Sequence, residues 1–177
     1  MIFCRLDLYF FPILDIYTPI DRTILGYKEL FSPIRRFSMK KAAVIHDLSG
    51  FGKCSLTAAI PVLSALGVQC CPVATAVLTG QTGYPCYHCT DLTAMLPDYI
   101  DAWGKNNAHF DAIYSGFLTG AEQISQVLDF IHHFRKEHTL LLVDPVMGDD
   151  GNAYPFFTPG LLNGMKELTL EADVITP

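Results

Sequence analysis

The sequence is poor in charge and contains no long apolar run. Charged residues make up 17% of the 177 residues, and 18 acidic against 12 basic side chains give a net charge of -6. This balance offers no bulk attraction to nucleic acid or to an anionic membrane. No apolar run reaches the roughly 18 residues that a membrane-spanning helix needs. Since half of the residues are hydrophobic, we expect one globular domain that binds neither nucleic acid nor membrane.

The six cysteines also lack the spacing of a zinc finger. No secretory signal is evident, so we interpret them as reduced thiols in a cytoplasmic protein. Cys86 and Cys89 form a CxxC motif in a turn-rich loop, without a second such pair. A metal or redox role for this pair is the alternative to a plain loop with small polarizable side chains, which we favour.

Residues 1–38 have no sustained helical or strand periodicity. Three prolines interrupt them, and Arg5 and Asp7 are unsuitable for the apolar segment of a signal peptide. A regular strand pattern begins just after Met39. We therefore expect residues 1–38 to be an atypical N-terminal extension outside the core, with Met39 as the natural start. The alternative is an amphipathic arm that packs on a partner.

From residue 40 onward, strand patterns and helix patterns alternate. The predicted strands are 42–46, 68–78, 110–116, 139–144 and 172–176, and the predicted helices are 55–67, 91–105, 121–137 and 159–170. Almost continuous apolar strands that alternate with helices are typical of a parallel sheet covered on both faces. The sequence therefore predicts an α/β fold with three layers and a mostly parallel central sheet.

Local signals mark several helix ends. Gly67 predicts a helix stop, and Pro61 predicts a late start or a kink in the same helix. Asp91 is a candidate N-cap for the second helix. The pair Thr119 and Glu122 has capping-box spacing, and Thr158-Pro159 predicts an N-cap followed by proline at the first helical position.

The segments that follow four of the strands carry polar chemistry. They read HDLSGFGK, LTGQTGY, SGFLTG and DPVMGDDG. Ligands of open parallel α/β sheets bind beyond the carboxyl ends of the strands. Because all four segments contain glycine with a hydroxyl or carboxylate, we expect a small-molecule pocket at this edge.

The acidic residues of the fourth segment are candidate metal ligands. Asp144 ends an apolar run, and a charge there is costly without a cation. We expect Gly148 to allow a tight turn that brings Asp149 near Asp144. Two carboxylates suit Mg²⁺, which keeps water and phosphate oxygens as its other ligands. In the alternative interpretation, these are ordinary turn residues.

The glycines of the first segment match no standard phosphate loop. The stretch SGFGK lacks the spacing of GxxxxGK[ST] and the third glycine of GxGxxG. A turn with glycine at positive φ explains it equally well.

Taken together, the motifs resemble the pyridoxal kinases of the ribokinase-like superfamily. The stretches HDLSGFGKCSL, TAVLTGQTGY, YSGFLTGAEQI, VDPVMGDDG and ADVITP carry the resemblance, which runs from about Lys41 to Pro177. It implies a ribokinase-like fold, and ATP-dependent phosphorylation of the 5′-hydroxymethyl group of pyridoxal, pyridoxine or pyridoxamine. It also implies Mg²⁺, a monovalent cation as a further candidate, and a homodimer as a candidate assembly.

The resemblance implies a role for several residues. Asp47 and Ser49 lie in the segment that contacts the pyridine ring; many relatives have serine at the position of Asp47. Thr82 and Gly83 match the substrate-contacting segment, with Gln81 where histidine is usual. Residues 84–89 lie where the family has a mobile flap.

Other residues match the phosphate side of the family's site. Asp144 matches an aspartate beside the phosphates and cations, Asp149 a position associated with Mg²⁺, and Thr176 a threonine near the ATP phosphates. The family's general base and anion hole belong to a GTGD segment, which is expected beyond Pro177. The resemblance thus covers the N-terminal part of the kinase domain, 39–177, and we expect impaired activity from this chain alone.

Two other functions stay open at this point. A hydroxymethylpyrimidine kinase of the same superfamily has a comparable first segment, and a non-catalytic remnant would at most bind the vitamer. A sugar kinase is disfavoured because the first segment lacks the sugar-binding pattern of that family.

Overall fold

The computed structural model describes residues 39–149, 151–154 and 158–176. The predicted extension, residues 1–38, lies outside the described residues, as do Asp150 and Pro177. The boundary predicted between residues 38 and 39 therefore stays a prediction.

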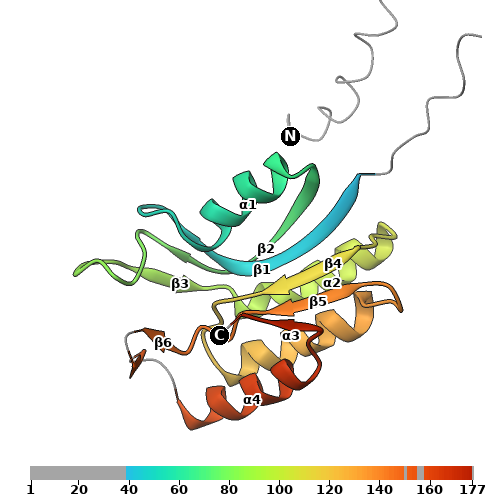
Figure 1. The fold of residues 1–177 in the computed structure, drawn as a ribbon. Helices are drawn as coiled ribbons and strands as arrows, with labels where there is room; N and C mark the ends of the chain where they lie inside the picture. Colours follow the sequence, from blue (N-terminus) through green and yellow to red (C-terminus); the bar gives the residue numbers. More distant parts are fainter. Residues whose placement is uncertain (1–38, 150, 155–157, 177) are drawn as a thin grey trace, which may run out of the picture. The chain divides into compact units, whose positions relative to one another are not determined.

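The described residues form a central sheet with helices on both faces (Figure 1). Its strands, in the order β3-β2-β1-β4-β5-β8 across the sheet, are Cys89–Asp91, Val68–Leu78, Lys40–Ser49, Ala112–Ser115, Leu140–Val143 and Val174–Ile175. All neighbouring pairs are parallel except β2 and β3, which are antiparallel. The sheet is therefore mostly parallel, as predicted.

The helices divide unequally between the two faces of the sheet. They are α1 (Ser55–Ala65), the short 3₁₀ helix η4 (Thr93–Met95), α2 (Leu96–Lys105), α3 (Ala121–Phe134) and α4 (Pro159–Leu170). Figure 1 shows α1 on one side of the sheet and α3 and α4 on the other. The fold thus has the three layers that the alternating pattern predicted.

Alternate residues of β1 explain how the sheet supports both layers. Ala42 and Val44 are buried with Leu56 of α1, whereas Ala43 and Ile45 belong to the larger core beneath α2, α3 and α4. Side chains of a strand point alternately to opposite faces, so one short apolar strand supplies both cores. This central position fixes the carboxyl end of β1 in the middle of the sheet edge.

Two predicted helix ends are confirmed. Gly67 follows α1 with φ +74°, a conformation that suits glycine after a helix. The Thr158 side chain accepts a hydrogen bond from the Leu161 amide, and Pro159 is the first residue of α4. Helix α1 begins at Ser55 and continues through Pro61, so the predicted late start is wrong.

Two predicted caps are wrong. Asp91 ends β3 instead of capping α2, which begins only at Leu96; its carboxylate accepts a hydrogen bond from the Thr93 amide. At α3 the N-cap is Gly120, and Gln123 rather than Glu122 reaches back to the Thr119 amide. Both side chains also bond to distant residues, Asp91 to the Thr119 hydroxyl and Gln123 to the Thr75 carbonyl, and a local sequence signal does not register these partners.

Within the described part of the chain, every helix is too short or too polar to cross a membrane.

Candidate functional site

The strand order changes direction at β1. The chain runs from β1 to β2 and β3 on one side, and then returns to β4, β5 and β8 on the other. A crevice forms outside the carboxyl ends of the strands where a parallel sheet reverses its order. The carboxyl ends of β1 and β4 therefore mark the expected ligand site.

A cavity of about 410 Å³ lies at this edge of the sheet. Its walls come from the end of β1, the start of α1, the loop after β2 and the segments that follow β4 and β5. The lining residues are Asp47, Ser49, Cys54, Ser55, Leu78, Gln81, Thr82, Gly83, Tyr87, Phe117, Val146 and Tyr154. The four residues predicted to contact substrate, Asp47, Ser49, Thr82 and Gly83, are all among them.

Asp47 is the buried acidic group of this cavity. Only 4% of the residue is exposed, and one carboxylate oxygen accepts a 2.7 Å hydrogen bond from the Ser49 hydroxyl. A buried carboxylate needs hydrogen-bond donors, and Ser49 supplies one of them. The arrangement can therefore accept a further N–H or O–H donor from a ligand in the cavity.

The loop of residues 79–88 connects β2 to β3 and contains all of the predicted flap segment 84–89 except Cys89, which begins β3. We call this whole loop the flap, and it forms one wall of the cavity. The Thr79 amide donates to the His88 carbonyl at 3.0 Å, and the His88 amide donates to the Thr79 hydroxyl at 2.9 Å. The Gln81 amide donates to the Phe51 carbonyl, and the rings of Phe51 and Tyr84 lie 4.9 Å apart. The flap thus rests on the glycine-containing loop after β1.

Two of the predicted phosphate-side residues, Asp144 and Thr176, follow neighbouring strands, which lie two and three positions from β1 in the sheet. Val143 pairs with Ile175, so Asp144 and Thr176 follow the paired ends of β5 and β8. The Thr176 amide donates to the Val143 carbonyl at 3.1 Å. Neither residue lines the cavity, which places the predicted phosphate side beside the predicted substrate side.

The Asp144 carboxylate is half-buried and has one described hydrogen-bond donor. The Val146 amide lies 3.2 Å from Oδ1. Burial raises the pKa of Asp144 above its ordinary value, and the Val146 amide opposes that shift. A cation beside this carboxylate would offset the cost of its ionisation.

The predicted tight turn at Gly148 is wrong. Gly148 and Asp149 form β6, which pairs antiparallel with β7, Asn152–Ala153, at the same edge as the flap (Figure 1). A Cβ at Gly148 would lie 2.1 Å from the Asn152 carbonyl oxygen, so glycine is required for close approach of the two strands. The position of the Asp149 side chain lies outside what the structure describes, and its predicted proximity to Asp144 stays a prediction.

The described residues could hold Mg²⁺ only if phosphate oxygens and water molecules supplied most of its ligands. Among the described residues, no group of three or more His, Cys, Asp or Glu side chains is arranged to hold a metal. Mg²⁺ commonly binds through one or two carboxylates with phosphate oxygens and waters. Asp144 meets that requirement, whereas a metal held entirely by protein ligands is not supported in this part of the chain.

His46 is a buried histidine at the switch point. It is 4% exposed, and its ring contacts the edge of Tyr114 at a centroid distance of 4.3 Å. Its Nε2 atom and the Ser115 hydroxyl are buried without a hydrogen-bond partner in the described residues. Burial lowers the pKa of His46 to about 4, against the opposing charge of Asp47. The ring is therefore neutral at pH 7.

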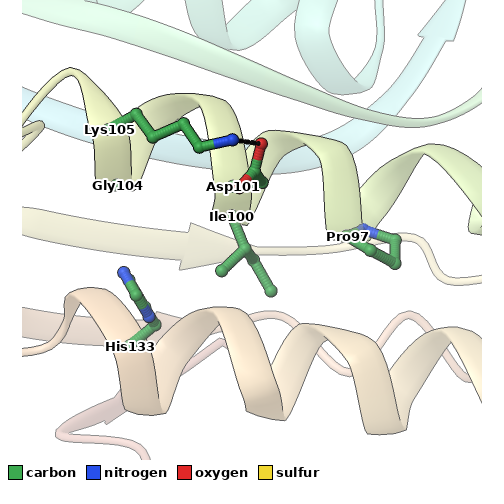
Figure 2. A pocket seen from close by; sticks show the side chains of 6 residues that line it. All are labelled: Pro97, Ile100, Asp101, Gly104, Lys105 and His133. Atoms are coloured by element: carbon green, nitrogen blue, oxygen red, sulfur yellow. Dashed lines mark hydrogen bonds and ion pairs between the residues drawn. The ribbon is translucent and has the colours of Figure 1, made fainter.

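A larger cavity, of about 480 Å³, lies between α2 and α3 (Figure 2). It is lined by Pro97, Ile100, Asp101, Gly104, Lys105 and His133, and the Lys105 ammonium contacts the Asp101 carboxylate at 2.7 Å. Its lining comes from helix surfaces and contains none of the loops that follow the strands. Of these two cavities, the smaller one combines the strand ends with a buried carboxylate, so we take it as the candidate functional site.

Most of the cavity wall comes from the four segments in which the sequence predicted a pocket. Eight of the twelve lining residues belong to these segments, and Tyr87 lies in the predicted flap segment 84–89. Cys54, Ser55 and Tyr154 line the cavity without having been predicted. Cys54 and Ser55 directly follow the first segment, so they could have been proposed from their position alone. Tyr154 follows the hairpin of β6 and β7, whose Asp150-Gly151 dipeptide is a turn signal that was not interpreted as a hairpin.

Comparison with known proteins identifies the fold. No family model matches the chain. The chain is 46% identical to a Bacteroides thetaiotaomicron protein described as a phosphomethylpyrimidine kinase, with a TM-score of 0.77 over 81% of this chain and 50% of that one. Pyridoxal kinase from Lactobacillus plantarum is 32% identical, with a TM-score of 0.72 over 78% and 49%. The described residues therefore have the ribokinase-like α/β fold, as predicted.

The curated relatives agree with the resemblance seen in the sequence. The pyridoxine/pyridoxal/pyridoxamine kinase of Bordetella avium is 33% identical over 135 residues, which cover 72% of this chain and 45% of that protein. This chain is accordingly a relative of the pyridoxal kinases. It spans less than half the length of the curated relatives it matches.

Proposed function

We propose that this chain carries the vitamer-binding part of a kinase that phosphorylates the 5′-hydroxymethyl group of pyridoxal, pyridoxine or pyridoxamine with ATP. The observation that carries the proposal is the 410 Å³ cavity, which brings Asp47, Ser49, Thr82 and Gly83 together at the switch point. Its volume lies within the usual range for small-molecule sites. A crystal form of the Bacteroides thetaiotaomicron relative contains pyridoxal, which supports the same ligand class here.

Asp47 is the proposed partner of the pyridine ring. Its carboxylate, already oriented by Ser49, accepts a hydrogen bond from a protonated ring nitrogen. Tyr87 and Phe117 supply aromatic surface in the same cavity, and the flap excludes water from the reacting hydroxymethyl group.

The phosphate side of the proposed reaction lies at Asp144 and Thr176. In phosphoryl transfer, a protein chiefly positions the reactants and stabilises the charge of the transferred group. We propose that Asp144 holds Mg²⁺ on the ATP phosphates, that Asp149 adds to the same site and that the Thr176 hydroxyl contacts a phosphate. A monovalent cation is a further candidate here. Among the described residues we assign no general base.

A hydroxymethylpyrimidine kinase is the second candidate. The description of the Bacteroides thetaiotaomicron relative as a phosphomethylpyrimidine kinase supports it in part, since that substrate carries the same kind of ring but already bears a phosphate. A pyrimidine carries ring nitrogens that Asp47 could also bind, so the two functions differ in which ring the cavity prefers. A non-catalytic chain that only binds the vitamer is the third. A cytoplasmic location and a homodimer, both expected from the sequence, are part of the proposal and await fractionation and sedimentation measurements.

The experiment combines calorimetry with an assay of ATP-dependent pyridoxal 5′-phosphate formation. Pyridoxal, pyridoxine and hydroxymethylpyrimidine are titrated separately into the purified chain. Tighter binding of the pyridines supports the proposed function, and turnover decides between a kinase and a binding-only chain. Binding of hydroxymethylpyrimidine alone, or of none of the three, would contradict it.

Asp47→Asn is expected to weaken pyridoxal binding about tenfold to a hundredfold, because a hydrogen bond to a charged partner contributes about 1.5–3 kcal/mol. Asparagine keeps the size of the side chain and loses the charge. Asp129→Asn, on the exposed face of α3, is the matched control and should bind as the unchanged chain does. Equal affinity of Asp47→Asn and the unchanged chain would remove Asp47 from the proposed site.

Asp144→Asn is expected to have opposite effects on function and stability. Binding of Mg²⁺-ATP should weaken about tenfold or more, because the charged ligand is lost. Because the pKa of Asp144 is raised in the folded state, ionisation of its carboxyl lowers the free energy of unfolding. This loss of stability develops as pH rises from the ordinary pKa of the carboxyl through its raised pKa in the folded chain. The variant should therefore be more stable to urea than the unchanged chain at pH 7 and lose that advantage near pH 3. Lower stability of the variant at pH 7 would contradict the burial argument.

A further inference from the structure

One buried glutamine joins the flap to the wall of the cavity. Gln123, in the first turn of α3, is 1% exposed. Its Oε1 accepts a hydrogen bond from the Thr119 amide at 2.9 Å, and its Nε2 donates to the Thr75 carbonyl at 2.8 Å and to the Thr93 hydroxyl at 3.0 Å. The single side chain thus connects the loop before α3, strand β2 and helix η4.

A second set of hydrogen bonds extends these connections to β3. The Thr119 hydroxyl donates to one oxygen of the Asp91 carboxylate, and the Thr93 amide donates to the other at 2.7 Å. These bonds lower the pKa of Asp91 below its ordinary value although partial burial opposes them. We call the five residues Thr75, Asp91, Thr93, Thr119 and Gln123 the Gln123 network.

The network meets the cavity at Phe117. The Thr75 hydroxyl, in a residue that is fully buried, donates to the Phe117 carbonyl at 2.9 Å. Phe117 lines the cavity, and Thr119 lies two residues further along the same loop. The position of this wall therefore depends on hydrogen bonds that begin in β2 and α3.

The same network meets the flap at β3. This strand has three residues, all exposed, and pairs with β2 at the edge of the sheet. So short an edge strand has little stability of its own. Asp91 is its last residue, and the Leu92 amide that follows donates to the Thr75 carbonyl at 3.0 Å. The Thr75 carbonyl therefore accepts hydrogen bonds both from the segment that follows the flap and β3 and from the Gln123 side chain.

We propose that Gln123 is a positioning residue that couples the flap to the Phe117 wall, so that the two sides of the cavity are fixed together. The inference rests on the proposed function of the cavity, to which it adds a residue that contacts no ligand. Its amide is suited to this task because it offers an acceptor and two donors in one plane. Breaking one branch of the network should therefore loosen the flap and the wall at once.

Two variants test the coupling, and a third serves as the conservative control. Gln123→Met keeps the approximate volume and removes all three hydrogen bonds. Thr119→Val removes only the hydroxyl that reaches Asp91, so it remains informative if Gln123→Met does not fold. Thr119→Ser retains that hydroxyl and should restore the behaviour of the unchanged chain.

The measurements are hydrogen exchange in the free chain and the Kd for pyridoxal. We expect exchange in residues 79–92 and 116–120 to become about tenfold faster in Gln123→Met and Thr119→Val, with β1 and β5 unchanged. The Kd for pyridoxal should rise by a similar factor in both variants and not in Thr119→Ser.

Three results would overturn the proposal. Exchange that accelerates throughout the sheet would make Gln123 an ordinary stabilising residue. Faster exchange in the flap without any change in residues 116–120 would remove the coupling. If the flap and the wall exchange faster in the variants but the Kd for pyridoxal is unchanged, the coupling has no effect on binding. If the unchanged chain binds no pyridoxal, the proposed function fails, while the exchange data alone still decide whether the coupling exists.

Discussion

Gly116→Ala is expected to lower the free energy of unfolding by about 3 kcal/mol, near the upper end of the usual cost of overpacking. A Cβ at this position would lie 2.1 Å from His46 Cε1 and 2.3 Å from Nδ1. The ring has no space to move into, because it is 4% exposed and packs against Tyr114. The substitution therefore forces the ends of β1 and β4 apart, and urea unfolding measures the cost.

A second glycine substitution provides the control for Gly116→Ala. A Cβ at Gly160, in the first turn of α4, would meet Ala121 Cβ at an ordinary 3.5 Å. Alanine is the better helix former, so Gly160→Ala should raise the free energy of unfolding by about 0.5 kcal/mol. Adding His46→Ala to Gly116→Ala should recover part of the loss, since it removes the clashing ring. If the free energy of unfolding of Gly116→Ala differs from that of the unchanged chain by less than about 0.5 kcal/mol, the packing argument is wrong.

The consequence of Gly116→Ala should extend to the site. Phe117 follows Gly116 directly and lines the cavity, and the Gly116 amide donates to the Ile45 carbonyl at 2.9 Å. A displacement at Gly116 therefore moves a cavity wall relative to Asp47. Weaker pyridoxal binding by the folded variant would connect the switch point to the proposed function.

The layered architecture could be predicted because it depends on local periodicity. Apolar runs such as residues 140–143 are long enough to identify buried strands, and Gly67 and Thr158 mark helix ends by their own backbone and side-chain chemistry. Each of these signals depends on residues that are close together in the chain, so the sequence alone is sufficient to recognise it.

Elements that depend on distant partners could not be predicted in the same way. Strand β3 is three exposed residues, and it exists because it pairs with β2 and because Thr119 bonds to Asp91. The hairpin of β6 and β7 has local partners, three to five residues apart, but strands of two residues are too short to show an apolar alternation. Gln123 did leave a signal, since it lies four residues before Val127 on the buried stripe of α3, where a polar residue requires partners.

The candidate site was predicted mainly through resemblance. Periodicity indicated which edge of the sheet would bear the ligand, but it did not separate Asp47 and Ser49 from other polar residues there. The structure adds that these two residues lie in the cavity, whereas Asp144 and Thr176 lie beside it. Distances between loops follow from strand order, which the sequence pattern does not determine.

Acid is expected to destabilise this chain by roughly 3 kcal/mol through His46 alone, since each unit of pKa shift corresponds to about 1.36 kcal/mol. The folded pKa of His46 is about 4, against 6.5 as the ordinary value, and burial is the main cause. The unfolded chain therefore binds a proton at a higher pH than the folded chain does. Stability from this group is complete above pH 6.5 and is lost as pH falls from there toward 4.

The measurement is the free energy of unfolding between pH 8 and pH 4 in the unchanged chain, in His46→Gln and in His138→Gln. Glutamine cannot be protonated in this range, so His46→Gln should have a flatter curve than the unchanged chain. His138 is exposed, and its variant should follow the unchanged chain. The nearby charge of Asp47 favours the protonated ring and limits the shift, while burial opposes protonation more strongly. If the free energy of unfolding depended on pH equally in His46→Gln and in the unchanged chain, the folded chain would accept a protonated His46. The inference that His46 packs against Tyr114 as a neutral ring would then be wrong.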